Sequence, residues 1–339
     1  MDVVVLGIRL CSRLQPSNDN NNRGFLLDAL EKILKEKKRI MKSNIILQGD
    51  VLVKLKELKN NSIDCIVTSP PYWGLRDYGH ENQIGLENTP EEYVEKIVEI
   101  FREVKRVLKN DGSLWLNLGD SYAGNNSRAS NNGRAGYGNK RETVTARFGN
   151  GLKNKDLVGI PWRVAFALQA DGWYLRQDII WAKPNPIPES VKDRCTKSHE
   201  YLFLLTKQAK YYFDNEAIKE DTVEKIKNSK KEFSGDKNSN SKDPKHQTKN
   251  GNIYKYNSKR NKRDVWFIPP RPFKEAHFAV MPEALVEPCI LAGSKKGDIV
   301  LDPFLGSGTV ALVAKKNNRK YIGIEINPDY IKIAEKRLS

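Results

Sequence analysis

Short apolar runs alternate with amphipathic stretches along most of this 339-residue chain. From residue 44 onward, runs such as NIILQ, SIDCIVTS and GDIVLD have the length and β-branched content of buried strands. The strongest helical stretch between them is EEYVEKIVEIFREVKRVLK, with Thr89 as its N-cap and Pro90 in its first turn. This alternation predicts an α/β fold with a Rossmann-like, doubly wound, mostly parallel sheet, whose ligands bind at the carboxyl ends of the strands.

One strand–loop–helix unit near the C-terminus has the composition of a nucleotide-binding turn. Residues 300–314 read VLDPFLGSGTVALVA, and Gly306 and Gly308 permit close backbone approach and left-handed backbone conformations. Glu325 ends the next strand, where an acid can accept hydrogen bonds from ribose hydroxyls. The loop lacks the third glycine of dinucleotide sites, and Asp302 suits a cation better than a pyrophosphate. A nucleoside that carries an amino acid ammonium group, S-adenosylmethionine, fits this unit.

A second strand ends in a rigid turn. Residues 66–72 read IVTSPPY, so Ser69 stands before two consecutive prolines, Pro70 and Pro71, and Tyr72 follows them. Prolines donate no N–H and fix φ, which makes the turn stiff. A hydroxyl, stiff backbone carbonyls and an aromatic face together predict a site for a flat ligand that bears an amino group.

The two motifs together resemble those of the DNA amino-methyltransferases. TSPPYW resembles their catalytic motif, and the segment from Leu301 to Arg337 resembles their S-adenosylmethionine motif. The catalytic motif comes first, as in the permuted β group of that family. Ser-Pro-Pro-Tyr resembles the N4-cytosine enzymes of restriction–modification systems, although some adenine-N6 enzymes also carry this serine. The resemblance covers residues 44–120, 158–207 and 264–339.

The resemblance implies a binding site for the cofactor. The loop from Asp302 to Thr309 would wrap the methionine end, Glu325 would take the ribose hydroxyls, and Asp50 would lie near the adenine. His277 begins a segment that would close over the methionine moiety, or it is simply a helix-entry residue. The full set implied is Asp50, His277, Phe278, Asp302, Pro303, Phe304, Gly306, Ser307, Gly308, Thr309, Glu325 and Asn327.

The resemblance also implies how the catalytic turn works. An exocyclic amine is a poor nucleophile because its lone pair is delocalised into the base. The Ser69 hydroxyl oxygen and the Pro70 carbonyl would accept its hydrogens and stabilise the charge that develops on attack. Pro71 would keep the turn rigid and Tyr72 would stack on the base. That base would be flipped out of the duplex, since it cannot be reached inside it.

The positive charge of the chain is concentrated in two segments. The formal net charge is +16, and residues 121–155 and 219–263 contribute +6 and +8 of it. Both segments are rich in Asn, Ser, Gly and Lys and poor in aliphatic residues, which predicts loops. A nearly neutral body with basic loops indicates a clamp on the phosphate backbone of double-stranded DNA.

These features suggest four segments. Residues 1–42 are an extension of unknown role, 43–184 the catalytic half with the basic loop, 185–263 a target-recognition insert, and 264–339 the cofactor half. In the insert, Arg194, Lys197 and His199 are candidate DNA contacts, or members of an ordinary connecting loop. Trp73 and Arg76 either shape the base pocket or fill the gap beside it.

The cysteines indicate the cellular compartment, and other sequence patterns allow alternative functions to be weighed. The four cysteines are scattered without metal-ligand spacing, so we expect no metal, no disulfide and a reducing, cytoplasmic compartment. DNA binding would make the enzyme nucleoid-associated. Pro288-Cys289 is reminiscent of carbon-5 cytosine methylation but lies in an apolar helical pattern, which favours a packed thiol. Protein glutamine methylation would need the cofactor loop first, and a non-catalytic DNA-binding protein would not need both motifs. A cognate restriction endonuclease is an expected partner, and the pattern leaves monomer or homodimer open.

Overall fold

The computed structural model describes residues 42–75, 83–123, 151–221, 259–271 and 280–339. The expectations for Arg76, His277, Phe278, residues 1–41 and most of the two basic segments lie outside these ranges. Among the described residues, no helix has the length and apolar character needed to cross a membrane.

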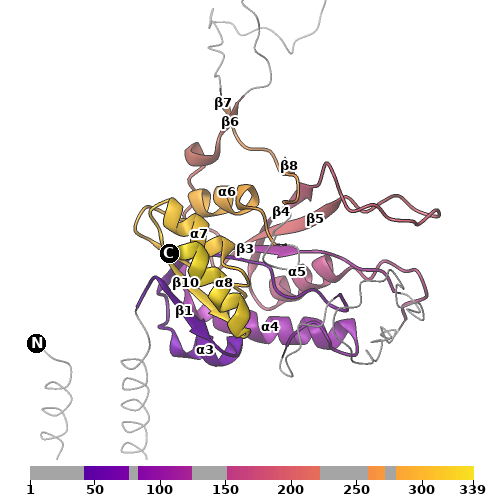
Figure 1. The fold of residues 1–339 in the computed structure, drawn as a ribbon, viewed down its shortest axis with the longest axis horizontal. Coiled ribbons are helices and arrows are strands. Elements are labelled where there is room, and N and C mark those ends of the chain that lie inside the picture. The colour runs from indigo at the N-terminus through magenta and orange to yellow at the C-terminus, as the bar shows by residue number, and fades with distance from the viewer. Residues whose placement is uncertain (1–41, 76–82, 124–150, 222–258, 272–279) are drawn as a thin grey trace, which may run out of the picture.

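An eight-stranded sheet forms the centre of the molecule (Figure 1). Its strands, in spatial order, are β1 (Ile45–Gln48), β10 (Lys320–Glu325), β9 (Ile299–Asp302), β2 (Ile63–Thr68), β3 (Leu108–Leu118), β5 (His199–Thr206), β4 (Tyr174–Ala182) and β8 (Val265–Phe267). The first five are parallel to their neighbours, β5 is antiparallel to both β3 and β4, and β8 is parallel to β4. The predicted mostly parallel α/β sheet is confirmed. A separate pair, β6 (Glu220–Asp221) and β7 (Lys259–Arg260), is antiparallel.

Helices cover both faces of the sheet (Figure 1). One apolar cluster joins the sheet to α3 (Val51–Glu57), α4 (Pro90–Val107) and α5 (Ile160–Ala170). Two further clusters on the opposite face involve α6 (Glu283–Gly293), α7 (Thr309–Lys316) and α8 (Pro328–Leu338). Such burial on both faces explains why the central strands read as continuous apolar runs rather than as alternating ones.

Helix α4 begins where its sequence predicts. The Thr89 side chain accepts a hydrogen bond from the Glu92 backbone N–H at 3.2 Å, and Pro90 occupies the first turn. Its buried stripe includes Tyr93, Ile97 and Phe101, at the spacing of one helical face. The helix therefore fixes the position of the segment that follows β2.

The antiparallel direction of β5 matters for the site. Tyr201 near its start pairs with Leu118 at the end of β3, and His199 pairs with Ala182 at the end of β4. The beginning of β5 therefore lies at the same sheet edge as the carboxyl ends of its neighbours. Within the region 185–263, the expected target-recognition insert, β5 is an inner strand of the central sheet.

Candidate active site

A cavity of about 600 Å³ opens at this edge of the sheet. Both sequence motifs line it, the catalytic turn from Ser69 to Tyr72 and the glycine loop from Asp302 to Ser307. They meet because β2 and β9 are neighbours, with Ile66 paired to Leu301. Of the other candidate residues, the cavity is also lined by Asp50, Lys197, His199, Thr309, Glu325 and Asn327.

Asp302 is a buried carboxylate at the tip of β9. It is 2% exposed and accepts hydrogen bonds from the Thr68 hydroxyl at 2.7 Å and from the Phe304 backbone N–H at 3.0 Å. Burial raises the pKa of Asp302 to about 7, the two hydrogen bonds oppose this rise, and the nearby Glu325 charge adds to it. A buried acid of this kind fits an ammonium group, which would favour its ionised form.

Glu325 shapes the glycine loop. One carboxylate oxygen accepts from the Gly306 N–H and the other from the Asn327 N–H, both at 2.8 Å. Gly306 has φ of 52° and Gly308 of 83°, in the left-handed region that favours glycine. A Cβ on Gly308 would lie 2.8 Å from the Ala334 Cβ in α8. Gly308 is thus needed for packing against α8, and it is not among the residues that line the cavity.

Arg337, which the sequence reasoning missed, ties the same loop to α8. Its guanidinium donates to the Ser307 carbonyl at 2.7 Å, to the Ser307 hydroxyl at 3.0 Å and to the Thr309 hydroxyl at 3.1 Å. In the sequence it is one more basic residue in the last turn of a helix, a position that usually needs no further explanation.

Asp50 and Asn327 line the cavity and also cap helices. The Asp50 carboxylate accepts from the Val53 N–H at 3.0 Å at the start of α3. The Asn327 side chain accepts from the Asp329 N–H at 2.9 Å at the start of α8. Each candidate cofactor contact is therefore held in place by the helix that it begins.

The catalytic turn is fixed from two sides. The Tyr93 hydroxyl of α4 donates to the Pro71 carbonyl at 2.9 Å. A Cβ added to Gly119 would lie 2.5 Å from a ring atom of Tyr72, so the backbone after β3 packs directly on that ring. The Ser69 hydroxyl donates to the Tyr72 hydroxyl at 3.3 Å.

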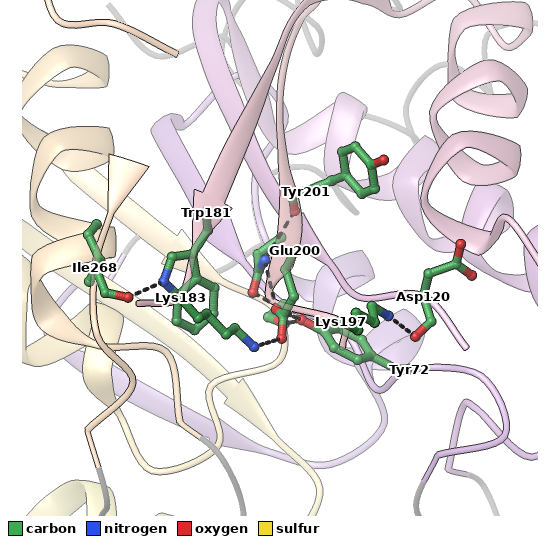
Figure 2. A network of polar contacts seen from close by, with 10 residues as sticks. Tyr72, Asp120, Trp181, Lys183, Lys197, Glu200, Tyr201 and Ile268 are labelled. Carbon is green, nitrogen blue, oxygen red and sulfur yellow. Dashed lines mark hydrogen bonds and ion pairs between the residues drawn. The ribbon is translucent and has the colours of Figure 1, made fainter. Parts of the chain in front are cut away.

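A polar network that the sequence did not reveal lies behind Tyr72 (Figure 2). The Tyr72 hydroxyl donates to the Glu200 carboxylate at 2.7 Å, and the Asn117 amide donates to the same oxygen at 3.2 Å. Lys183 forms an ion pair with the other oxygen of Glu200. Burial, and then the negative charge of Glu200, raises the pKa of Tyr72 well above its ordinary value. The phenol is therefore neutral and remains a proton donor.

The candidate DNA contacts fall into different environments. Lys197 and His199 line the cavity, and the Lys197 ammonium donates to the Asp120 carbonyl (Figure 2). Burial lowers the pKa of Lys197. Arg194 forms an ion pair with Glu189 at 2.6 Å and is not among the cavity-lining residues. Trp73 is 4% exposed and its indole N–H donates to the Glu87 carbonyl at 2.9 Å, which supports the gap-filling alternative for this residue.

Cys289 is a packed thiol, as its apolar surroundings in the sequence indicate. It is fully buried in α6, and its sulfur donates to the Leu285 carbonyl at 3.2 Å. Burial raises the pKa of Cys289 well above its ordinary value. A thiol of this kind is a poor nucleophile, which argues against carbon-5 chemistry.

Comparison with known proteins agrees with this geometry. The family model for N6 and N4 methyltransferases, described as DNA methylase, matches residues 63–336. The Type II methyltransferase M.Cfr9I of Citrobacter freundii is 46% identical over 317 residues, covering 91% of this chain and 92% of that relative. The Type II methyltransferase M.SmaI of Serratia marcescens is 44% identical over 321 residues, covering 94% and 98%.

Two solved structures have a similar fold. The PvuII DNA methyltransferase (cytosine-N4-specific) superposes with a TM-score of 0.59 at 19% identity, covering 89% of this chain and 88% of that one. A putative DNA modification methylase from Thermus thermophilus, solved in complex with S-adenosyl-L-methionine, gives a TM-score of 0.52 at 21% identity, covering 86% and 93%. The chain therefore belongs to the DNA methylase family, as a Type II amino-methyltransferase that uses S-adenosyl-L-methionine and acts on DNA.

Proposed function

We propose that this enzyme methylates the N4 amine of a cytosine that is flipped out of duplex DNA at a short recognition sequence. The observation that carries the proposal is the single cavity lined by both Ser69 and the loop from Asp302 to Ser307. Serine in the catalytic turn and the cytosine-N4-specific name of a structural relative favour cytosine over adenine. In a restriction–modification setting, the modification protects the site from a cognate nuclease.

In this proposal the chain holds the cofactor with the residues around the glycine loop. Asp302 pairs with the ammonium of the methionine moiety, Glu325 accepts from the ribose hydroxyls, and Asp50 lies near the adenine. Phe304 contributes apolar surface beside them. The cofactor supplies an electrophilic methyl group on a sulfonium. The protein residues orient that group toward the catalytic turn.

The catalytic turn prepares the amine. Ser69 Oγ and the Pro70 carbonyl accept hydrogen bonds from the two amine hydrogens, which draws the nitrogen lone pair out of the ring. The amine would thus be held ready to take the methyl group that the bound cofactor would supply, and the proton lost from the nitrogen would pass to solvent. Tyr72 stacks on the base. Alignment of the two reactants supplies roughly 7–11 kcal/mol in well-oriented systems.

DNA is held around the cavity mouth. Lys197 and His199 lie beside the base pocket and contact the flipped nucleotide or its phosphates. The two basic segments hold the opened duplex through its backbone, and residues of the region 185–263 outside β5 read the sequence. Extrusion of the base costs a few kcal/mol, which these contacts offset.

Nucleoside mass analysis of DNA methylated in vitro tests the proposal. We expect N4-methylcytosine in digests of DNA incubated with enzyme and S-adenosyl-L-methionine, and none with heat-treated enzyme. N6-methyladenine as the product would overturn the choice of base while leaving the family assignment intact. Absence of any methylated base, together with absence of cofactor binding in calorimetry, would favour a non-catalytic DNA-binding protein.

A further inference from the structure

Glu200 lines the cavity and is surrounded by hydrogen-bond donors (Figure 2). Its side chain is 14% exposed, and it takes donors from Tyr72, Asn117 and Lys183. These donors come from the catalytic turn, β3 and the end of β4, so three separate parts of the fold converge on one carboxylate. No sequence motif of this chain assigns a role to it.

The direction of each hydrogen bond can be fixed from the contacts. Asn117 donates from its amide nitrogen both to the Tyr201 carbonyl at 3.1 Å and to Glu200, so its amide oxygen faces Tyr72. Tyr72 has one proton, and both Glu200 and the Asn117 oxygen are acceptors. The Glu200 contact is shorter, 2.7 Å against 3.1 Å, and it ends on a charged acceptor.

The direction of the Tyr72 proton also determines how the Ser69 hydroxyl is oriented. Because the Tyr72 proton points to an acceptor behind it, the phenol oxygen is left to accept, and the Ser69 hydroxyl donates to it at 3.3 Å. The Ser69 proton is then directed toward the Tyr72 oxygen. Its lone pairs remain to accept a hydrogen from the target amine, which is the role that the proposed mechanism requires.

We propose that Glu200 is a positioning residue for methyl transfer, which sets the direction of the Tyr72–Ser69 hydroxyl chain so that Ser69 acts as an acceptor. This inference rests on the proposed function of Ser69. In Glu200→Gln, the amide N–H group would face either Tyr72 or Lys183. In the first arrangement the Tyr72 proton goes either to the Asn117 amide oxygen, 3.1 Å away, or to Ser69. In the second case the serine proton would turn toward the amine.

Lys183 keeps the carboxylate in place. Its side chain is 20% exposed and its ammonium lies 4.4 Å from the ring centroid of Trp181. The Trp181 indole in turn donates to the Ile268 carbonyl at 2.8 Å, next to β8 (Figure 2). The cation and its supports therefore hold the Glu200 side chain in position without a direct contact to Ser69.

A double-mutant cycle in the full-length enzyme tests the inference. Glu200→Gln, Tyr72→Phe and the double variant are compared by single-turnover methyl transfer at saturating DNA and cofactor. We expect Glu200→Gln to slow transfer by about tenfold to a hundredfold, below the ~10²–10³-fold loss caused by removing a group that contacts the developing charge. Cofactor affinity should be unchanged, and Glu200→Gln should add little in the Tyr72→Phe background.

Asp64→Asn is the matched control. Asp64 is also a strand carboxylate at 14% exposure that is paired with a lysine, Lys109, at 2.5 Å, but it lies at the opposite end of β2. It reports the effect on thermal stability of losing a partly buried carboxylate, which also accepts from the Ile299 N–H at 2.9 Å. Its transfer rate should match that of the wild type.

Three outcomes would overturn the inference. They are a wild-type transfer rate in Glu200→Gln, a wild-type rate in Tyr72→Phe, and rate losses that multiply fully in the double variant. If Glu200→Gln does not fold, Tyr72→Phe still decides, because it keeps the ring and removes the hydroxyl link. The product of the wild-type enzyme is identified separately, so an adenine product would contradict the proposed base without deciding the role of Glu200.

Discussion

At the scale of single residues, the site depends on groups whose charge or proton is held in an unusual state. Asp302 is an acid with a pKa of about 7 because it is buried, and Tyr72 is a phenol kept neutral by burial and by Glu200. Both states come from neighbours that are distant in sequence. The residues themselves were recognisable in their motifs, but their protonation depends on the fold.

Asp302 predicts a pH dependence of cofactor binding. Below pH 7 the free enzyme holds this carboxyl protonated, and it must lose the proton to pair with an ammonium. We therefore expect affinity for S-adenosyl-L-methionine to fall by up to about tenfold per pH unit below pH 7, with proton release on binding. Calorimetry in buffers of different ionisation enthalpy measures both.

Thr68→Val provides the matched test of this explanation. The Thr68 hydroxyl lowers the pKa of Asp302, so its removal should move the midpoint of the affinity curve to higher pH. Proton uptake on binding, or a midpoint that moves to lower pH, would contradict the assignment.

Ser69→Ala tests the acceptor role directly. We expect single-turnover methyl transfer to slow by about 10²–10³-fold, because one acceptor for the amine is lost, while the cofactor dissociation constant stays unchanged. Ser62→Ala is the control, since that hydroxyl donates to the Lys59 carbonyl outside the cavity. Equal losses of rate and cofactor affinity in Ser69→Ala would disprove the role.

At the scale of elements, strand direction explains which parts of the site were predictable. The sequence places Ser69 and Asp302 at the carboxyl ends of two strands, and neighbouring parallel strands bring such residues to one edge. Glu200 opens a strand, where the same rule expects no ligand. Only the antiparallel insertion of β5 between β3 and β4 brings it to that edge.

Arg337 was missed for a related reason. Amphipathic periodicity places it on α8 but does not say which loop the helix packs against. Its contacts with Ser307 and Thr309 depend on the close approach of α8 to the glycine loop at Gly308. Periodicity predicts elements and their buried faces, whereas such side-chain anchors depend on how the elements are placed in space.

Arg337→Met should loosen the cofactor loop while keeping the aliphatic stem. Hydrogen bonds from a charged donor contribute about 1.5–3 kcal/mol, so we expect cofactor affinity to fall by about tenfold or more. Isothermal titration gives the dissociation constant. Lys332→Met on the exposed side of α8, where Lys332 pairs with Asp329 at 2.9 Å, should bind the cofactor normally. Equal effects of the two variants would contradict the anchor.

At the scale of the whole molecule, each of the two basic segments begins and ends at positions that are hydrogen-bonded to each other. The Ala123 N–H donates to the Asp156 carbonyl at 2.8 Å, and β6 pairs with β7, so each segment leaves and rejoins the body at one place. The described residues alone form the eight-stranded sheet and line the cavity between the two sequence motifs. This supports a division of labour in which the body carries catalysis and the basic segments carry DNA affinity.

Charge substitution in the second segment tests this division. Replacing Lys225, Lys227 and Lys230 by Gln should weaken DNA binding and reduce the slope of log affinity against log salt by about 0.9 per lost phosphate contact. Cofactor affinity and melting temperature should not change. Fluorescence anisotropy with labelled duplex at several salt concentrations measures the slope.

The control uses lysines at the opposite end of the sheet. Lys296, Lys316 and Lys320 are exposed near the beginnings of β9 and β10 and the end of α7, away from the cavity edge. The same three-residue change there should leave the salt slope unaltered. A slope that drops equally in both variants would show that net charge alone, and not this segment, governs binding.

The short span between β4 and β5 has a mechanical consequence. Its two ends are joined by the Lys183 N–H, which donates to the Ser198 carbonyl at 2.7 Å, and by the ion pair of Lys183 with Glu200. Residues 184–198 therefore form a loop whose two ends both lie beside the Lys183–Glu200 ion pair, which lines the cavity. If DNA contacts residues 184–198, as we propose, the contact would also act on the groups next to Tyr72 and so couple DNA binding to the geometry of the catalytic turn.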